Sequence, residues 1–343
     1  MAELVNIECP LCANASSFID VRVPPADGNI RNYGVLYEGL ELSRWKVCGR
    51  CGFVHQNPRP SIEALNRFYL AGDYHPKKID LAPDAVYASH AHGYEDEIEY
   101  AIEKSGLSSG SVFDVGCGFG VALAMFQKRG WTSYGVEPDP SRAAFGKEHF
   151  GLANVRAGVL DGAFDLGRTV DLVFTHHAFE HFADLPDVMR SITKLLRPGG
   201  FMFTAIPTYR ENRSTMSKLW MNSAHYSLFS HHSFDQLLAR YGFERVAYRY
   251  NPWNAGPDQL GHLARYTGVP TAPERHYEDP QEVARYLDVI NPIRSRVYLP
   301  LIGGYRGYRW HFQRAAAYAR GVAKMLVTNP DEFLAKAASK FRR

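Results

Sequence analysis

The chain has 343 residues, of which 45% are hydrophobic and 22% charged, and its formal net charge is +3. This composition is that of an ordinary soluble protein, long enough for a large core and an appendage. No basic-then-apolar leader follows Met1, and no apolar run approaches about 18 residues. Secretion and membrane spanning are therefore not expected, and we expect a cytoplasmic protein.

Residues 1–60 contain two Cys-x-x-Cys pairs, formed by Cys9 with Cys12 and by Cys48 with Cys51. Four thiolates are the tetrahedral ligand set that structural zinc prefers, and two disulfides are the poorer alternative in a cytosolic chain. The gap between the pairs exceeds the common spacing of roughly 15–20 residues, so we expect strand-like material at 33–45 between them. The pattern predicts a zinc ribbon with a structural Zn²⁺ ion.

Two helices are expected between this ribbon and the next motif. Residues 61–70 have apolar side chains at helical spacing behind Ser61, which can cap the first turn. A linker rich in Pro, Asp and Lys follows at 73–83. Residues 84–105 form the second predicted helix, which includes His90 and Tyr94 among acidic residues.

A strand, a glycine turn, a helix and a second strand follow at 112–137. The turn consists of Gly116, Cys117, Gly118, Phe119 and Gly120, and the second strand ends at Glu137. This is the nucleotide half-site of a doubly wound sheet, in which an acid about 20 residues after the turn accepts hydrogen bonds from a ribose. Asp114 precedes the turn and would repel a pyrophosphate, which favours a cationic or zwitterionic ligand that carries a ribose. A glycine turn without a ligand is the alternative.

Strands and helices then alternate up to about residue 268. The sequence predicts strands at 153–156, 170–175, 201–206, 243–249 and 259–265, helices at 141–149, 184–196 and 233–241, and a tight stop at 197–200. This alternation is typical of an α/β domain with a mostly parallel sheet.

The glycine turn and its flanking residues resemble the first motif of class I S-adenosylmethionine-dependent methyltransferases, apolar-apolar-Asp-apolar-Gly-x-Gly-x-Gly. The runs E-H-F-A-D-L-P, which begins at Glu180, and L-L-R-P-G-G-F, which ends at Phe201, resemble the fourth and fifth motifs of the same group. The resemblance implies a Rossmann-like, doubly wound, seven-stranded α/β sheet and S-adenosylmethionine as methyl donor. The implied domains are a zinc ribbon (1–60), a helical linker with a cofactor-covering helix (61–107), a methyltransferase domain (108–268) with an acceptor-site insertion (207–230), and a basic helical extension (269–343).

The resemblance also implies which residues contact the cofactor. We expect Val159 and Leu160 to flank the adenine and Asp161 to reach its amino group, although an acid at this position can also simply cap a turn. Cys117 is expected to line the cofactor pocket. For His90 and Tyr94, packing is favoured over substrate contact. The cofactor-binding candidates are Asp114, Gly116, Cys117, Gly118, Gly120, Glu137, Val159, Leu160, Asp161 and His176.

His181, His225 and Tyr226 are the catalytic candidates, because histidine is the side chain best suited to accept a proton near neutral pH. With the cysteine pairs, they resemble a pattern in zinc-containing deoxysugar C-methyltransferases. The Glu that precedes the second histidine there is Ala224 here. We therefore predict O-methylation of a small molecule or saccharide, with a nucleotide-sugar or glycan hydroxyl as acceptor, and keep C-methylation of a nucleotide-linked keto-deoxysugar as the alternative. Both histidines could instead be scaffold residues.

Two further hypotheses compete with this interpretation. Residues 291–343 carry many Arg and Lys residues against Asp331 and Glu332. This basic tail could contact a membrane, a polymer or RNA phosphates, or it could be a solvated helical face. An RNA-directed methyltransferase is less favoured, because the rest of the chain is acidic. A non-catalytic adaptor is less favoured still, because Asp114, Gly116, Gly118 and Glu137 are all present.

Overall fold

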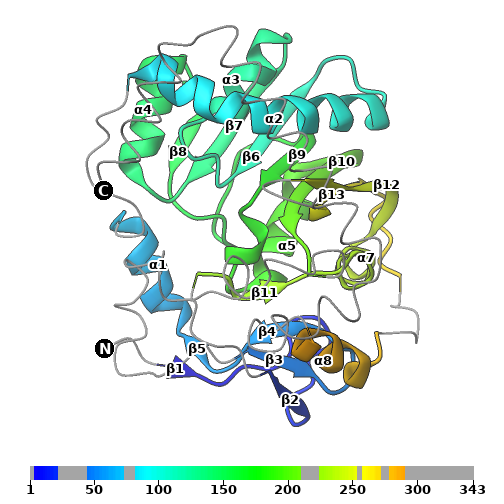
Figure 1. Ribbon diagram of the computed structural model, residues 1–343. Coiled ribbons are helices and arrows are strands. Elements are labelled where there is room, and N and C mark those ends of the chain that lie inside the picture. The colour runs from blue at the N-terminus through cyan, green and yellow to red at the C-terminus, as the bar shows by residue number, and fades with distance from the viewer. Residues whose placement is uncertain are drawn as a thin grey trace, which may run out of the picture. The chain divides into compact units, whose positions relative to one another are not determined.

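The computed structural model describes residues 4–21, 45–72, 82–209, 224–252, 257–271 and 278–289 (Figure 1). All of them lie in the first of two compact units, Met1–Pro292 and Ile293–Arg343. Four of the sequence predictions therefore fall outside the described residues, wholly or mostly. They concern the strand-like material at 33–44, the linker at 73–81, the middle of the acceptor-site insertion at 210–223, and the basic tail from 290 onward.

The predicted seven-stranded sheet is present. Its strands lie in the order β12-β13-β10-β9-β6-β7-β8. Only β13 runs antiparallel to its neighbours, and the remaining pairs are parallel. The strands are β6 (Ser111–Val115), β7 (Thr132–Glu137), β8 (Val155–Ala157), β9 (Val170–His176), β10 (Leu196–Pro207), β12 (Phe243–Pro252) and β13 (Pro257–Tyr266).

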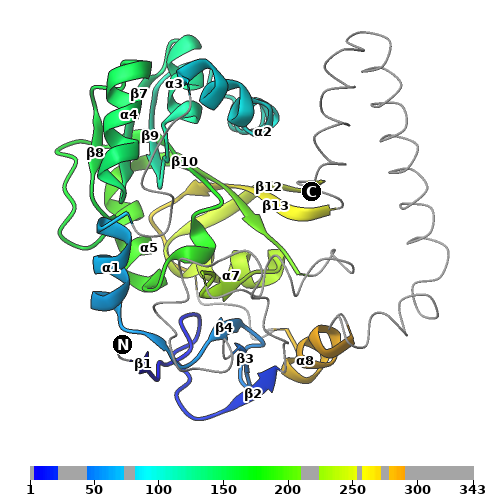
Figure 2. The same cartoon turned by 60° about the vertical axis from the view of Figure 1, so that its left-hand side comes forward.

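Helices cover both faces of this sheet (Figures 1 and 2). One face carries α2 (Pro83–Ser105), α3 (Val121–Lys128) and α4 (Pro140–Phe150), and the other carries α5 (Leu185–Leu195) and α7 (His231–Arg240). The short 3-10 helix η2 (Phe179–His181) follows β9. Among the described helices, none combines the length and apolarity needed to cross a bilayer.

Side chains of the central strands alternate between two apolar cores. Val112 and Leu172 pack with the helices of the first face, whereas Phe113 and Val173 pack with those of the second. All four are fully buried. A strand whose successive side chains enter opposite cores must be apolar throughout, and this explains why the predicted strands are continuous hydrophobic runs.

The predicted stop at 197–200 is wrong, because β10 already begins at Leu196. Leu196 pairs with Val170 and Phe201 with Leu172, so four residues of β10 bulge opposite Asp171 alone. Gly199 has φ 75°, a conformation that glycine adopts without strain. The Pro-Gly-Gly run therefore makes a bulge at the start of the strand and does not separate the strand from α5.

Asp171 holds this bulge against the start of β6. Its carboxylate accepts hydrogen bonds from Ser111 N (2.8 Å), Ser111 Oγ (2.8 Å) and Arg197 Nε (2.6 Å). Burial alone would raise the pKa of Asp171, but Arg197 and Ser111 outweigh it and the net pKa is lowered. The carboxylate thus stabilises the fold above its unfolded-state pKa, and this contribution disappears as the pH falls through the lower folded-state pKa.

We expect Asp171→Asn to lower the thermal unfolding midpoint by about 2–6 °C at pH 7, which corresponds to a loss of about 1–2 kcal/mol. The difference from the wild type should shrink as the pH is lowered toward 3, because the wild-type carboxyl is then protonated as well. Calorimetry at both pH values would measure this. Glu244→Gln, at an exposed position on β12, is the matched control, and a pH-independent difference would contradict the explanation.

The cysteine pairs lie in a separate small module. Strands β2 (Phe18–Val21), β3 (Trp45–Cys48) and β4 (Val54–Gln56) form an antiparallel sheet, and β1 (Leu4–Val5) pairs with β5 (Arg59–Pro60). The predicted helix α1 (Ile62–Leu70) follows, with Ser61 as its N-cap. The later helix α8 (Pro280–Val289) packs Val283 and Leu287 against Trp45 and Val47 of this module.

A strand that is distant from the module in the sequence completes the sheet of the module. β11 (Ser227–Leu228) pairs antiparallel with β4, so that the order is β11-β4-β3-β2. Gln56 reinforces the junction, since its Nε2 donates to His225 O (2.6 Å) and its backbone N donates to Tyr226 O (2.9 Å). The module is thereby bonded through the backbone to the segment that carries two of the predicted catalytic residues.

Candidate functional site

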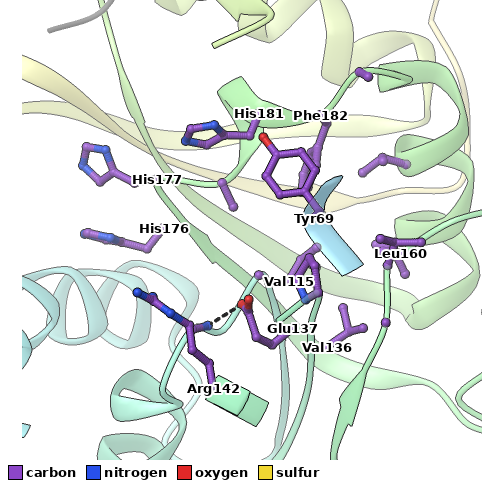
Figure 3. Close-up of a pocket in the computed structure, with 18 of the residues that line it drawn as sticks. Tyr69, Val115, Val136, Glu137, Arg142, Leu160, His176, His177, His181 and Phe182 are labelled. Atoms are coloured by element: carbon purple, nitrogen blue, oxygen red, sulfur yellow. Dashed lines mark hydrogen bonds between the residues drawn. The ribbon is translucent and has the colours of Figure 1, made fainter. Parts of the chain in front are cut away.

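A cavity of about 1090 Å³ opens at the C-terminal ends of the parallel strands. This is the edge of a doubly wound sheet at which ligands bind. Its walls come from the glycine turn and the end of β7, the loop after β8, the segment after β9, and helices α1 and α2. Figure 3 shows His176, His177 and His181 along one side of this space, with Leu160 and Val136 on another and Glu137 near the glycine turn.

The glycine turn brings bare backbone to the cavity wall. Gly116 and Gly118 line the cavity and have φ values of 75° and 55°, which side chains other than glycine rarely adopt. A Cβ atom added at Gly116 would lie 3.0 Å from the Cβ atom of Ala178. The turn therefore requires glycine both for its conformation and for its close approach to the segment after β9.

Glu137 connects the glycine turn to the end of β7. Its carboxylate is buried, and Oε2 accepts a hydrogen bond from Gly118 N (2.8 Å) while Oε1 accepts one from Asp139 N (3.0 Å). Glu137 also lines the cavity, and a carboxylate oxygen can accept more than one hydrogen bond. This geometry fits the predicted role of Glu137 as an acceptor for ribose hydroxyls.

Three other predicted cofactor residues lie beneath the cavity wall and are not part of it. Asp114 is buried next to Glu137, and burial together with that neighbouring acid raises its pKa. Cys117 is buried in the apolar core of the α2–α4 face. A Cβ atom at Gly120 would meet the side chain of Leu152. Their places indicate that they support the turn from behind.

The loop after β8 forms another wall, and it includes Val159, Leu160 and Asp161, the residues expected near the adenine. Asp161 Oδ1 accepts a hydrogen bond from Ala163 N (3.0 Å), so this acid caps a turn. Its second oxygen, Oδ2, keeps the geometry compatible with a ligand contact as well. The sequence left both roles open, and the structure shows the turn-capping one.

Helices α1 and α2 contribute residues that sequence reasoning did not assign to the site. Tyr69 and Leu65 of α1 line the cavity, as do His90 and Tyr94 of α2, for which packing had been favoured. The Tyr94 ring packs edge-on against His176, with 4.7 Å between centroids. Burial lowers the pKa of His176 and raises that of Tyr94, so both side chains are neutral near pH 7.

Three histidines surround one buried carboxylate after β9. Glu180 is 1% exposed, and its Oε1 lies 3.5 Å from His177 Nδ1, 3.9 Å from His181 Nε2 and 3.9 Å from His225 Nε2. Burial alone would raise the pKa of Glu180, but the three imidazoles lower it to about 2. Glu180 is therefore ionised across the physiological pH range.

His177 belongs to a hydrogen-bonded chain that crosses the cavity wall. Its Nε2 lies 2.6 Å from Gln259 Oε1, and Gln259 Nε2 donates to Glu97 Oε1 (2.6 Å), which places the His177 proton on Nε2. Glu97 also lies 3.2 Å from Arg249 Nη2. Burial would lower the pKa of His177, but Glu180 outweighs it and the net pKa is raised. The backbone of His177 has φ 50°, rare for a side-chain-bearing residue.

Of the catalytic candidates, only His181 lines the cavity. Its ring stands perpendicular to that of His225, with 4.7 Å between centroids. His225 is 6% exposed and Tyr226 2% exposed, and Tyr226 packs with Leu65 and Phe68 of α1. His225 and Tyr226 thus lie behind His181, and their catalytic roles remain predictions.

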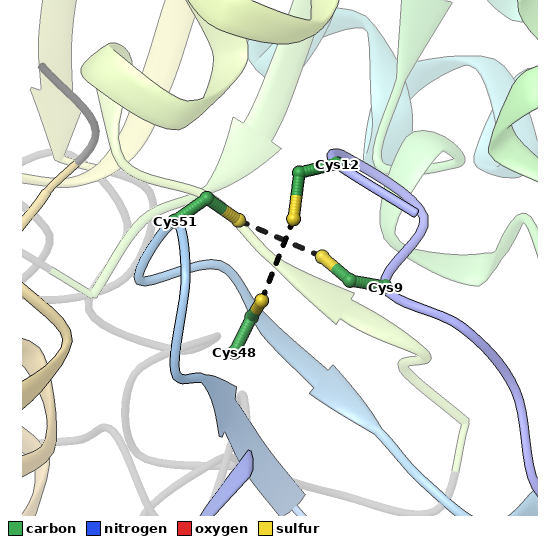
Figure 4. Close-up of side chains that lie close together, drawn as sticks. All are labelled: Cys9, Cys12, Cys48 and Cys51. Carbon is green, nitrogen blue, oxygen red and sulfur yellow. Dashed lines mark hydrogen bonds between the residues drawn. The ribbon is translucent and has the colours of Figure 1, made fainter. Parts of the chain in front are cut away.

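The four cysteines of the small module form a second candidate site. All four are buried, and no disulfide joins them. Their Sγ atoms point toward a common centre (Figure 4), where Cys9 and Cys51 are 3.6 Å apart and Cys12 and Cys48 are 3.5 Å apart. Four thiolates at about 2.3 Å from one tetrahedral ion would be about 3.8 Å apart, so the arrangement fits a Zn²⁺ ion.

Comparison with known proteins finds similarity in the domain around the large cavity. Residues 87–248 match the family model described as "Methyltransferase domain". The chain is 31% identical over 98 residues to a ubiquinone biosynthesis O-methyltransferase of Rhizobium johnstonii, a match that covers 27% of this chain and 40% of the relative. It is 30% identical over 112 residues to the enzyme of the same name from Vibrio parahaemolyticus, covering 31% and 48%. The chain thus spans less than half the length of these curated relatives.

Two solved structures are also similar to part of this chain. The glycopeptide N-methyltransferase MtfA, complexed with S-adenosylmethionine, is 16% identical, with a TM-score of 0.41, and the match covers 50% of this chain and 93% of that one. CalS10 from Micromonospora echinaspora, described as an amino pentose methyltransferase, is 19% identical, with a TM-score of 0.39, 56% of this chain covered and 100% of that one.

Proposed function

Because residues 87–248 match the family model described as "Methyltransferase domain", we propose that this protein transfers a methyl group from S-adenosylmethionine to a small-molecule or saccharide hydroxyl. The observation that carries the proposal is the contact between Glu137 and the glycine turn at the wall of the large cavity. It joins bare backbone and a ribose-binding carboxylate where a doubly wound sheet binds nucleotides.

The cavity has the residues to hold the cofactor. Glu137 would accept hydrogen bonds from the ribose, and Val159 and Leu160 would pack on the adenine. The bound cofactor supplies an electrophilic methyl group on a sulfonium. A volume of about 1090 Å³ slightly exceeds the roughly 300–1,000 Å³ of ligand sites, so an acceptor has room beside the cofactor.

The histidine-lined side of the cavity is where we propose that the acceptor loses its proton. His181 lines that side, and its Nδ1 lies 2.9 Å from Ala224 O, which can only accept a hydrogen bond. The proton of neutral His181 is therefore on Nδ1, and Nε2 keeps a lone pair. Burial lowers the pKa of His181, so the neutral form is available near pH 7. His225 supports the ring from behind.

An oxygen acceptor is favoured over carbon for two reasons. Ala224 stands where the resembling C-methyltransferases have a Glu, and the curated relatives are named as O-methyltransferases. C-methylation of a keto-deoxysugar remains the alternative, because the paired His181 and His225 could equally remove a proton from an acidic carbon.

A label-transfer screen tests the function. Tritiated S-adenosylmethionine would be offered in parallel to nucleotide-sugars, cell polysaccharide and total RNA. Label in a sugar fraction is the expected result, and its release as methyl iodide by hydriodic acid would identify O-methylation, because a C-methyl group is not released. Label in RNA alone would overturn the saccharide assignment and support an RNA-directed methyltransferase, and label in no fraction would count against all three.

We expect His181→Asn to reduce kcat about 100-fold to 10,000-fold while the Kd for S-adenosylmethionine changes little, because loss of a general base affects only the chemical step. Turnover and calorimetric titration of the cofactor would be compared. His232→Asn, an exposed histidine on α7, is the matched control. Equal losses in kcat and cofactor affinity would make His181 a scaffold residue.

We also propose that Cys9, Cys12, Cys48 and Cys51 hold a structural Zn²⁺ ion. The close approach of four buried, unbridged thiol sulfurs supports it. Four protein ligands leave no open position, so the ion would act in folding and not in methyl transfer.

A further inference from the structure

We propose that Glu180, His181 and His225 bind a second divalent transition-metal cation, such as Zn²⁺, at the histidine-lined side of the cavity. One ligand atom from each of these residues lies within 4.8 Å of the others. Glu180 and His181 come from η2 and His225 from the segment before β11, so the fold brings together residues distant in the sequence. Two imidazoles and a carboxylate are the protein ligand set of many catalytic zinc sites.

The orientation of His181 is that of a metal ligand. Its Nδ1–H donates to Ala224 O (2.9 Å), which leaves the lone pair on Nε2, and this atom lies 3.9 Å from Glu180 Oε1. A lone pair and an anionic oxygen repel each other unless a cation lies between them. Histidines that bind metals almost always donate the other ring N–H to a carbonyl or carboxylate, as His181 does.

Glu180 provides a second, independent observation. Its Oε2 is buried and has no hydrogen-bond partner among the described residues. A buried carboxylate oxygen without a partner is unfavourable, so native structures normally supply a partner. The protein positions this anion among imidazoles, and none of them approaches Oε1 closer than the 3.5 Å of His177 Nδ1. A cation would compensate the charge directly.

The spacing is slightly wider than that of an occupied site. Ligands about 2.1 Å from one tetrahedral ion are about 3.4 Å apart, whereas both histidine Nε2 atoms are 3.9 Å from Glu180 Oε1. Side-chain movements of less than about 1 Å would close the difference. The two rings are also nearly perpendicular, at 81°, so they can approach one ion without stacking on each other.

Three protein ligands leave a coordination position open, and His181 lies on the cavity wall, so that position would face the cavity. A cation there would bind the acceptor oxygen and lower the pKa of its hydroxyl. In the metal-bound protein, His181 and His225 would promote proton loss as ligands, which takes the place of the base role proposed above for metal-free His181. This consequence rests on the proposed methyl transfer, whereas metal binding itself does not.

The test is metal binding by the full-length protein, with Co²⁺ as the probe. Chelator-treated wild type would be titrated with Co²⁺ and followed by absorption and by metal analysis. Co²⁺ bound at the cysteine site gives a sulfur-to-cobalt charge-transfer band. The second equivalent of Co²⁺, bound at Glu180, His181 and His225, should give only the weak d–d bands of nitrogen and oxygen ligands. We expect Glu180→Gln and His181→Asn to weaken the second equivalent at least about 100-fold and to leave the charge-transfer band unchanged.

Three controls make the result decisive. Cys48→Ser should lose the charge-transfer band and His232→Asn should retain both equivalents. Thermal unfolding would verify that the Glu180→Gln, His181→Asn and His232→Asn proteins are folded. The proposal is overturned if only the thiolate-bound equivalent binds, or if Glu180→Gln and His181→Asn both bind the second one as tightly as wild type. Calorimetric titration of the chelator-treated protein with S-adenosylmethionine separates the proposed methyl transfer from the proposed metal site. If the cofactor did not bind, the methyl-transfer proposal would be refuted, and the Co²⁺ titration would still decide whether the metal site exists.

Discussion

Replacing Glu137 with alanine is expected to weaken S-adenosylmethionine binding about 100-fold to 10,000-fold. The side chain would offer two charge-assisted hydrogen bonds to the ribose, each of about 1.5–3 kcal/mol, and each 1.4 kcal/mol is a factor of ten in Kd. The substitution also removes the acceptor for Gly118 N, so the glycine turn loses the contact that fixes it. Calorimetric titration with the cofactor would measure the loss.

Two comparisons isolate the role of Glu137. Glu148→Ala removes an exposed acid from α4 and should leave the Kd unchanged. Asp114→Ala tests the acid that lies behind the turn, and its effect should be accompanied by a lower unfolding temperature, because Asp114 is 4% exposed. Cofactor heats for Glu137→Ala that match wild type would remove the cofactor assignment altogether.

Cys48→Ser is expected to lower both metal content and turnover, although the residue lies in the small module. Structural zinc contributes about 10–16 kcal/mol to the folding of small zinc peptides, so its loss should unfold the module. β4 would then no longer hold β11, and His225 and Tyr226 would lose their backbone hydrogen bonds to Gln56. We expect turnover to fall at least about 10-fold, as when supporting residues of a site are lost.

Metal analysis, turnover and thermal unfolding would be measured on the same preparations. Cys117→Ser changes the cysteine that lies outside the cluster and should retain the metal. A Cys48→Ser protein with full metal content would show that the thiolate cluster is not the zinc site. Loss of metal with unchanged turnover would instead contradict the coupling through β11.

Local patterns were sufficient to predict the sheet. Val112, Phe113, Leu172 and Val173 are apolar at successive positions because both faces of the sheet are covered, and such runs stand out in the sequence. The glycine turn was equally readable, because positive φ values restrict Gly116 and Gly118 to one residue type. Both signals arise from neighbouring residues, so a single sequence is sufficient to detect them.

The parts of the fold and of the site that the sequence did not predict depend on contacts between segments that are distant in the chain. β11 is only two residues long and has no periodicity of its own, so its pairing with β4 leaves no pattern to detect. Gln259 reaches His177 from β13, and nothing in either neighbourhood indicates the other. Glu180 belongs to a recognised run, yet its position among three imidazoles depends on where the chain returns at His225. The sequence thus predicted the glycine-turn side of the cavity better than the side lined by His176, His177 and His181.

The pairing of β11 with β4 has a consequence for dividing the gene. A fragment that ends after residue 60 would lack Ser227 and Leu228, so its sheet would expose the unpaired edge of β4. Grafting the cysteine module onto a different protein would therefore require the strand as well as the module. If the chain were instead cut between α1 and α2 and the two pieces expressed together, β11 would give them a shared edge on which to reassemble. We therefore expect that the protein can be split between α1 and α2 into two pieces that function only when they associate through β11 and β4.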